Sequence, residues 1–245
     1  MSTDQIFASD QHLIQSFANL DSLKQGIDRL AIAKGKGAYI YDSEGKRYID
    51  GMGGLWCVNI GHGNAEVIKA ITKQLEKLDY FSTFYSFTHP SAAELANKVA
   101  SMAPGHLNHV YFSNSGSVAN DTAIRILHHY NNLRKLPKKK KILSRVNAYH
   151  GSTHLSIAMT TPLFSEGWDG AKELVHHVRC PKREENELHL TDKVFLDILS
   201  DNMEQAIEQI GSDNIACFIA EPIMGAGGVI VPPKGYHKRM LDIMH

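Results

Sequence analysis

One unbroken apolar stretch near the end of the chain, residues 215–220, constrains the fold more than any other feature. It has the sequence Ile-Ala-Cys-Phe-Ile-Ala and is followed directly by Glu221 and Pro222. A strand with one solvated face alternates apolar and polar residues, so an unbroken run of strand length indicates a parallel strand buried on both faces. Because helices cover the faces of a parallel sheet, the rest of the chain must alternate between strands and helices.

Helical patterns and short apolar strands do alternate along the rest of the chain. A short helix is expected around Leu13–Leu23, and longer helices are expected to begin at Asn64, at Pro90, after Ser113–Ser117, at Thr191 and near Lys234. The expected strands are a hairpin in residues 38–50, then Val110–Phe112, Ile142–Leu143, Val175–Val178 and residues 215–220. This order predicts the α/β class, with a mainly parallel (mixed) sheet and helices on both faces.

Composition excludes several classes of protein. The 26 basic and 26 acidic side chains give a formal net charge of zero, so no global field attracts nucleic acid or an anionic membrane surface. No apolar run approaches the ~18 residues that span a bilayer, and Met1–Gln15 lacks the order of residues found in a secretory signal. The three cysteines form no Cys-x-x-Cys pair, and neither His-His pair has metal-ligand spacing. We therefore expect a cytoplasmic protein with no metal site.

Polar residues follow three of the predicted strands, and ligands of open α/β sheets bind at the carboxyl ends of strands. At the first end, Val110–Phe112 leads into Ser-Asn-Ser-Gly-Ser at positions 113–117, which opens a helix. The unpaired N–H groups and partial positive charge of a helix N-terminus suit one phosphate monoester. Capping of the helix by Ser113 or Ser115 explains the same residues equally well.

The second and third strand ends also have two interpretations each. Tyr149, followed by His150 and Gly151, could stack on a planar ligand, or it could be a buried tyrosine in a strand-to-helix turn. The charge of Glu221 at the end of an apolar strand must be hydrogen-bonded or directed at a polar ligand, because a buried unpaired carboxylate is costly. The glycine-rich residues 225–228 that follow it predict a tight turn.

In this order, the motifs resemble those of the class III (omega) aminotransferases, enzymes of the fold-type I pyridoxal-phosphate superfamily. The resembling stretches are residues 51–63, 81–90, 113–121, 149–153 and 221–229. Residues 54–59, Gly-Leu-Trp-Cys-Val-Asn, are most similar to the branch that uses pyruvate as amino acceptor and amines or omega-amino acids as donors. The resemblance implies the large domain of a fold-type I transferase and transamination as the activity.

The resemblance also implies a cofactor site and a substrate pocket. The end of the first strand would hold the phosphate of pyridoxal 5′-phosphate, and Tyr149 at the end of the second would stack on its ring. Glu221 at the end of the third would orient groups around the ring or support Tyr149. The implied cofactor-binding residues are Ser115, Gly116, Ser117, Tyr149, His150, Gly151 and Glu221. The implied substrate pocket is shaped by Trp56, Phe84 and Tyr85, the last two able to reach the site of a neighbouring subunit, because such enzymes are homodimers or higher homo-oligomers.

Two departures from the family pattern affect these expectations. Val118 stands where the family usually has a glutamate, which removes a polar contact but leaves the backbone donors. The lysine that forms a Schiff base with the cofactor is expected beyond His245, so no residue of this chain is expected to be catalytic and the isolated chain is expected to be inactive. The arm and a small-domain segment would occupy residues 1–60, and the large cofactor-binding domain, incomplete at its C-terminus, residues 61–245.

Two alternatives remain open. The chain could be a non-catalytic fragment or an assembly partner that binds a phosphate ligand, with the missing half on a second polypeptide. Within enzymes, the same scaffold could serve a sister reaction, such as that of an aminomutase or a decarboxylating transaminase. The pocket around Trp56 favours ordinary transamination only modestly.

Overall fold

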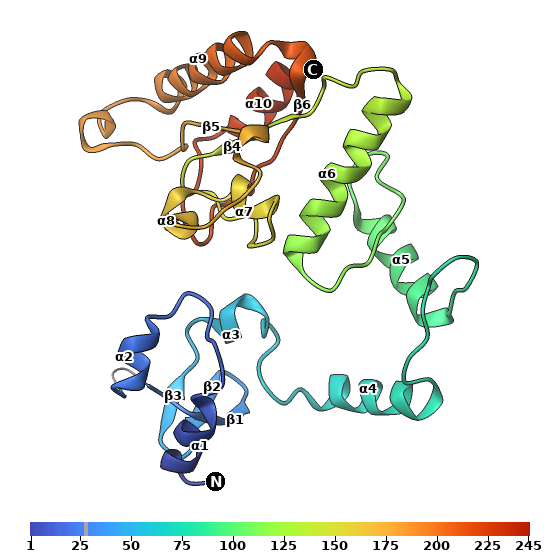
Figure 1. Ribbon diagram of the computed structural model, residues 1–245, viewed down its shortest axis with the longest axis vertical. Coiled ribbons are helices and arrows are strands. Elements are labelled where there is room, and N and C mark those ends of the chain that lie inside the picture. Colours follow the sequence, from blue (N-terminus) through green and yellow to red (C-terminus); the bar gives the residue numbers. More distant parts are fainter. Residues whose placement is uncertain (27–28) are drawn as a thin grey trace. The chain divides into compact units, whose positions relative to one another are not determined.

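The computed structural model describes residues 1–26 and 29–245, the side chains of residues 162 and 163 aside, and shows two units (Figure 1). The first unit is Met1–His109 and the second is Val110–His245. The division at residue 60, which the resemblance implies, stays a prediction.

The sheet of the first unit is antiparallel and contains the predicted hairpin. Its strands β1 (Ile32–Lys36), β2 (Tyr39–Asp42) and β3 (Arg47–Ile49) lie in the order β1-β2-β3. Asp42 Oδ1 accepts hydrogen bonds from the backbone N–H groups of Glu44 and Lys46, 3.0 and 2.9 Å away. Gly45 adopts a φ of 84°, which this tight turn requires and which favours glycine.

The helices of the first unit begin where their capping residues stand. They are α1 (Thr3–Asp10), α2 (Leu20–Lys24), the short turn α3 (Gly53–Trp56), α4 (Ala65–Lys77) and α5 (Pro90–Met102). Asn64 caps α4 by accepting from Val67 N–H at 3.1 Å, as predicted. The helix predicted around Leu13–Leu23 is wrong in its start, because Asn19 accepts from the N–H groups of Asp21 and Ser22 and so begins α2 at Leu20.

The sheet of the second unit is parallel and confirms the predicted α/β class. Strands β4 (Lys141–Arg145), β5 (Val175–Val178) and β6 (Ile215–Phe218) lie in the order β5-β4-β6, and both strand pairs are parallel. The prediction that residues 215–220 are buried on both faces is wrong: β6 is an edge strand of the described sheet, and only Ile215 in it is buried. The central, buried strand is β4.

Helices cover both faces of this sheet. Successive residues of a strand point to opposite sides, so neighbouring residues of β4 contact different helices. Leu143 of β4 packs with Phe195 of α9 (Asp192–Ile210) and with Tyr236 of α10 (Tyr236–Met244). The preceding residue, Ile142, packs instead with side chains of α6 (Gly116–Leu133) and α7 (Ser156–Met159). A further short helix, α8 (Pro162–Ser165), and three 3₁₀ turns, Lys172–Leu174, Glu185–Glu187 and Ser212–Asn214, lie in the connections.

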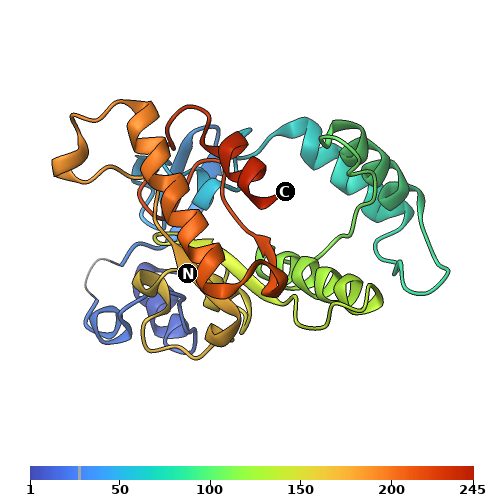
Figure 2. The same cartoon turned by 90° about the horizontal axis from the view of Figure 1, so that it is seen from above.

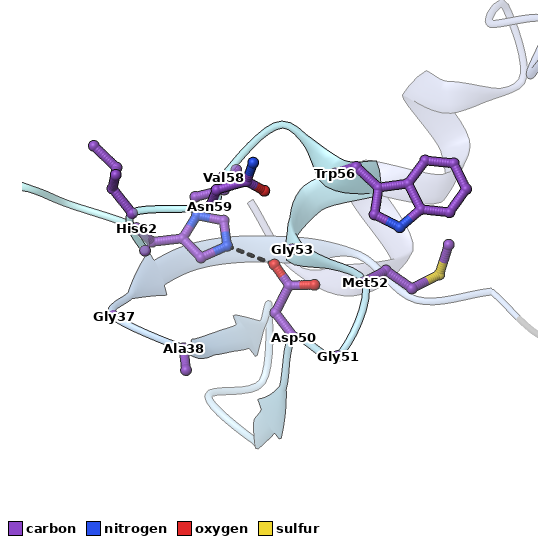
Figure 3. Close-up of a pocket in the computed structure, with 12 residues that line it drawn as sticks. Gly37, Ala38, Asp50, Gly51, Met52, Gly53, Trp56, Val58, Asn59 and His62 are labelled. Atoms are coloured by element: carbon purple, nitrogen blue, oxygen red, sulfur yellow. Dashed lines mark hydrogen bonds and ion pairs between the residues drawn. The ribbon is translucent and has the colours of Figure 1, made fainter. Parts of the chain in front are cut away.

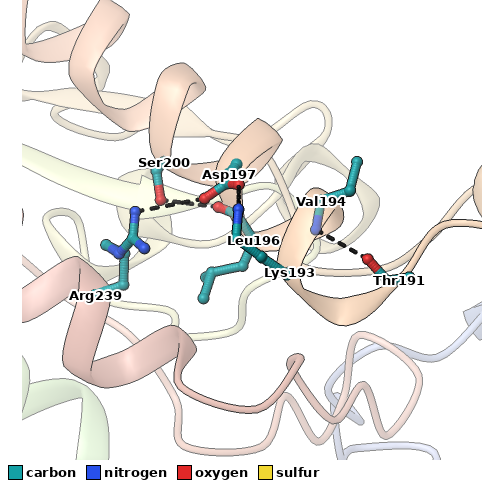
Figure 4. Close-up of polar contacts among 7 residues, drawn as sticks. All are labelled: Thr191, Lys193, Val194, Leu196, Asp197, Ser200 and Arg239. Atoms are coloured by element: carbon teal, nitrogen blue, oxygen red, sulfur yellow. Dashed lines mark hydrogen bonds and ion pairs between the residues drawn. The ribbon is translucent and has the colours of Figure 1, made fainter.

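Helices α9 and α10 lie side by side in both views (Figures 1 and 2). Thr191 caps α9 by accepting from Val194 N–H at 3.4 Å, as its sequence predicted. On the outer surface, Asp197 pairs with Lys193 at 3.0 Å and faces Arg239 of α10 at 3.6 Å (Figure 4). Exposed pairs of this kind contribute little, so the buried apolar contacts hold the two helices together.

The predicted strand Val110–Phe112 is absent. These residues pair with no strand of the described chain, and Tyr111 and Phe112 are 66% and 43% exposed. A strand exists only when a neighbour accepts and donates its backbone hydrogen bonds, and the local pattern of apolar residues cannot provide that neighbour.

Candidate functional site

The N-terminus of α6 has the geometry of an anion site. Ser115 is its N-cap: the backbone is extended and Oγ accepts from Val118 N–H at 3.2 Å. The N–H groups of Gly116 and Ser117 have no hydrogen-bond partner within the described residues. A Cβ added at Gly116 would meet no atom within 4 Å, so no neighbouring group packs against the side-chain position of Gly116. Capping and anion binding are therefore compatible, because they use different groups of the same turn.

The loop after β4 is hydrogen-bonded to this first turn of α6. Ser117 Oγ accepts from Ser152 N–H at 3.1 Å, and Asn120 Nδ2 donates to His150 O at 2.7 Å. Gly151 has a φ of 129°, and a Cβ on it would lie 2.5 Å from Ser117 Oγ. Only glycine allows this approach, so the first two predicted motifs lie together.

Glu221 connects this loop to the end of β6. Its Oε1 accepts from Tyr149 N–H at 3.2 Å and its Oε2 from Gly225 N–H at 2.9 Å. Its main-chain oxygen accepts from Arg145 Nη2 at 2.6 Å, and Arg145 is fully buried. Of the two interpretations left open by the sequence, the structure shows a carboxylate that is hydrogen-bonded by the backbone N–H groups of Tyr149 and Gly225.

His150 is only 7% exposed and is uncharged at neutral pH. Burial lowers its pKa to about 4; the negative charge of Glu221 opposes this shift, and the charges of Arg145 and His177 add to it. The backbone N–H of His150 donates to Thr160 Oγ1 at 2.9 Å, while Nε2 of its ring has no hydrogen-bond partner among the described residues. The imidazole of His150 is therefore a buried, neutral group.

The ring of Tyr149 is half-buried and lies edge-to-face with Phe164, at a centroid separation of 5.6 Å and an angle of 82°. Phe164 was missed from the sequence because it lies in an irregular segment with no periodicity. Asn120 and Arg145 were missed as well. The sequence signal for Asn120 and Arg145 is that each is a polar residue within an otherwise apolar or helical segment.

The first unit contains a separate pocket of about 530 Å³, on which Trp56 lies (Figure 3). Most of its wall is the glycine-rich stretch that the sequence singled out, together with the turn between β1 and β2. Phe84 and Tyr85 do not line this pocket: they are 66% and 90% exposed, and their rings lie edge-to-face with centroids 4.4 Å apart. The lining residues are Gly37, Ala38, Asp50, Gly51, Met52, Gly53, Trp56, Val58, Asn59, Ile60, Gly61 and His62.

Two other kinds of feature are absent from the described part of the chain. No three His, Cys, Asp or Glu side chains there are grouped so that they could hold a metal ion. No described helix combines the length and the apolar character that crossing a bilayer demands.

Comparison with known proteins agrees with this geometry. The family model for class III aminotransferases matches residues 23–245. The chain is 38% identical over 242 residues to the putrescine–pyruvate aminotransferase of Pseudomonas aeruginosa, which aligns 98% of this chain with 52% of that protein. It is 39% identical over 220 residues to gamma-aminobutyrate transaminase 1 of Oryza sativa subsp. japonica, covering 88% of this chain and 42% of that protein.

Solved structures show the same similarity. An (S)-enantioselective omega-transaminase from Thermomicrobium roseum superposes with a TM-score of 0.95 at 37% identity, covering 100% of this chain and 55% of that chain. The omega transaminase from Pseudomonas jessenii, solved in complex with PMP, gives 0.92 at 39% identity, covering 96% and 52%. The predicted resemblance and fold are thereby confirmed. The chain spans about half the length of the curated relatives it matches.

Proposed function

This chain belongs to the class III aminotransferase family, and we propose that its protein transfers an amino group from an amine or omega-amino acid to pyruvate or another 2-oxo acid. The observation that carries the proposal is the joining of three loops by hydrogen bonds. Ser117 Oγ accepts from Ser152 N–H, and Glu221 accepts from Tyr149 N–H. Together these bonds bring a set of anion-binding donors, an aromatic ring and a carboxylate into one cluster.

Pyridoxal 5′-phosphate fits the donors at the start of α6. The N–H groups of Gly116 and Ser117 and the hydroxyl of Ser117 would hold its phosphate, since all lie at the positive end of an 18-residue helix. Val118 removes a polar side-chain contact but leaves the N–H groups of Gly116 and Ser117 in place, and its own N–H donates to Ser115 Oγ. When bound, the cofactor supplies an electron sink for the carbon that carries the amino group.

The remaining residues of the cluster would fix the orientation of the ring. Tyr149 would stack on it, while Glu221 holds the backbone of Tyr149 with one oxygen and Gly225 with the other. His150, which is buried and neutral, belongs to the same loop and donates its backbone N–H to Thr160 Oγ1. These residues would orient the ring of the cofactor and exclude water from it. That the lysine that binds the cofactor follows His245 stays a prediction.

The donor would be a primary amine, and the family resemblance implies that Trp56 shapes the part of the site that receives it. Two relatives are named for putrescine and gamma-aminobutyrate, and both compounds are reasonable first donors to test with pyruvate. A homodimer or larger homo-oligomer stays a prediction, which sedimentation analysis of the intact protein would test.

The test of the cofactor site is the affinity of the intact protein for pyridoxal 5′-phosphate. Tyr149→Ala should raise the dissociation constant about 5-fold, because stacking contributes about 1 kcal/mol, whereas Tyr149→Phe keeps the ring and should bind normally. Ser117→Ala should also raise it about 10-fold, the effect of one hydrogen bond. Ser113→Ala is the matched control, because Ser113 Oγ donates to Ser115 O.

Formation of alanine from pyruvate and an amine tests the reaction itself. Turnover with either donor that depends on added cofactor supports the proposal. Normal cofactor binding without any amino transfer would instead favour a sister reaction. Unchanged affinity in Tyr149→Ala and Ser117→Ala would remove the cofactor site from this part of the chain.

A further inference from the structure

The turn α3, which carries Trp56, has an unfavourable backbone conformation. All four of its residues have positive φ: 54° at Gly53, 59° at Gly54, 60° at Leu55 and 63° at Trp56. Glycine adopts such angles freely, but residues with a Cβ atom pay for them in free energy. Leu55 and Trp56 therefore keep this conformation only if contacts outside the turn hold it.

Those contacts come from the two residues that flank the pocket segment. Asp50 and His62 lie on either side of residues 51–61, and His62 Nε2 lies 2.8 Å from Asp50 Oδ2 (Figure 3). The side chain of Asp50 is 10% exposed and that of His62 24%. The side-chain contact closes the segment into a loop whose ends are fixed against each other.

Both ends of the loop are also bonded to the same turn, between β1 and β2. Gly37 and His62 exchange two backbone hydrogen bonds of 2.9 Å, and Asp50 N–H donates to Ala38 O at 2.9 Å. Gly35 leaves room for the imidazole: a Cβ there would lie 2.6 Å from His62 Cγ. The ring therefore lies directly against the backbone of β1, and its orientation toward Asp50 is fixed.

Asp50 also acts on the turn itself. Its main-chain oxygen accepts from Gly53 N–H at 3.2 Å. Its carboxylate faces the backbone N–H groups of Gly54 and Met52 in addition to His62. The His62 ring, first, and then these N–H groups hold the pKa of Asp50 below its usual value, so the carboxylate is ionised at neutral pH. One side chain thus joins the end of the loop to the start of the left-handed turn.

We propose that Asp50 and His62 are positioning residues that hold the left-handed turn Gly53–Trp56 and so fix the indole of Trp56 beside the pocket. Neither residue needs to touch the substrate. Their effect on donor selection rests on the proposed function, whereas their effect on the turn does not.

The test combines a functional and a structural measurement on the intact protein. Asp50→Ala should change the ratio of kcat/KM for a small and a bulky amine about 10-fold, with Asp50→Asn intermediate. In a Trp56→Ala background the same change should leave the ratio unaltered, because Asp50 acts through Trp56. Amide exchange of residues 53–58 should accelerate at least 10-fold in Asp50→Ala.

Asp42→Ala is the matched control, because Asp42 accepts from the Tyr48 hydroxyl in the same sheet and is not one of the residues that line the pocket beside Trp56. It should alter neither the ratio nor exchange in residues 53–58. The proposal is overturned if Asp50→Ala leaves the exchange unchanged, or if its effect on the ratio persists without Trp56. If the protein transfers no amino group at all, the proposed function fails, and the exchange measurement still decides the role of Asp50.

Discussion

The two units differ in what holds their elements in place, although both have well-capped helices. In the second unit, Leu143, Phe195 and Met203 are at most 1% exposed. In the first unit, no described residue is buried. Capping and periodicity therefore define a helix locally, whereas the burial of its apolar face needs partners that lie far away in the sequence.

Helices α4 and α9 illustrate the difference. The apolar stripe of α4 consists of Val67, Ile68, Ile71 and Leu75, and each of these side chains is 41–55% exposed. The stripe of α9 is buried against the parallel sheet. Both patterns predict amphipathic helices equally well, and only α9 has its apolar face covered within the described chain.

Removing apolar side chains should give the largest contrast between the units. Phe195 is fully buried, and the guanidinium groups of Arg183 and Arg179 lie 4.6 and 5.5 Å from its ring. Phe195→Ala should lower the free energy of unfolding by about 4 kcal/mol, whereas the exposed Ile71→Ala should lower it by less than about 1 kcal/mol. Urea titrations followed by circular dichroism measure both. Equal losses would show that the first unit depends on a core as much as the second.

Glycine substitutions should separate a packed loop from an open turn. Gly151→Ala adds a Cβ 2.5 Å from Ser117 Oγ at a φ of 129°. Strain and overpacking together should cost roughly 3 to 4 kcal/mol. Gly45→Ala has similar strain at a φ of 84°, but its Cβ would meet no atom within 4 Å, so about 1 kcal/mol is expected. The same unfolding experiment tests both, and a small loss in Gly151→Ala would mean that the loop after β4 can move away from α6.

Local features of both units were predictable from sequence. Asn64, Ser115 and Thr191 start their helices where expected, because an N-cap and its partner lie within three residues. The position of β6 at the sheet edge was not predictable, because strand order depends on pairings that a strand's own residues do not encode. The prediction of a strand at Val110–Phe112 was wrong for the same reason.

The candidate site was predictable only in part. The motifs around Ser117, Tyr149 and Glu221 mark strand ends, so their proximity followed from the fold class. Their hydrogen-bond partners did not: Asn120 reaches His150 across 30 positions, and Arg145 reaches Glu221 across 76. Pairs so widely separated leave no local pattern.

The buried histidine should give the second unit a characteristic dependence on pH. His150 has a pKa of about 4 in the fold, against about 6.5 in the unfolded chain. Between these values the unfolded state binds a proton that the folded state does not, so stability falls as the pH is lowered from 6.5 to 4. The loss should reach about 3 kcal/mol and then level off.

The control for this prediction is His150→Gln, which carries no titrating group. The difference between the unfolding free energies of the two proteins should shrink by about 3 kcal/mol across this pH range and stay constant above pH 7. Subtracting the variant removes the contributions of all other titrating groups. A difference that does not vary with pH would show that folding does not lower the pKa of His150.

Removing helix caps should give the smallest effect and the sharpest distinction between the units. Asn64 caps α4 and Thr191 caps α9, and replacing either by alanine should cost about 1 kcal/mol. In α9 this cost should appear as lower global stability, because the buried face of the helix unfolds only with the core. In α4 it should appear as faster amide exchange in the first turn, because no buried side chain opposes fraying. Hydrogen exchange of the native chain measures both, and protection of α4 that changes only with global unfolding would mean that its exposed stripe is covered in solution.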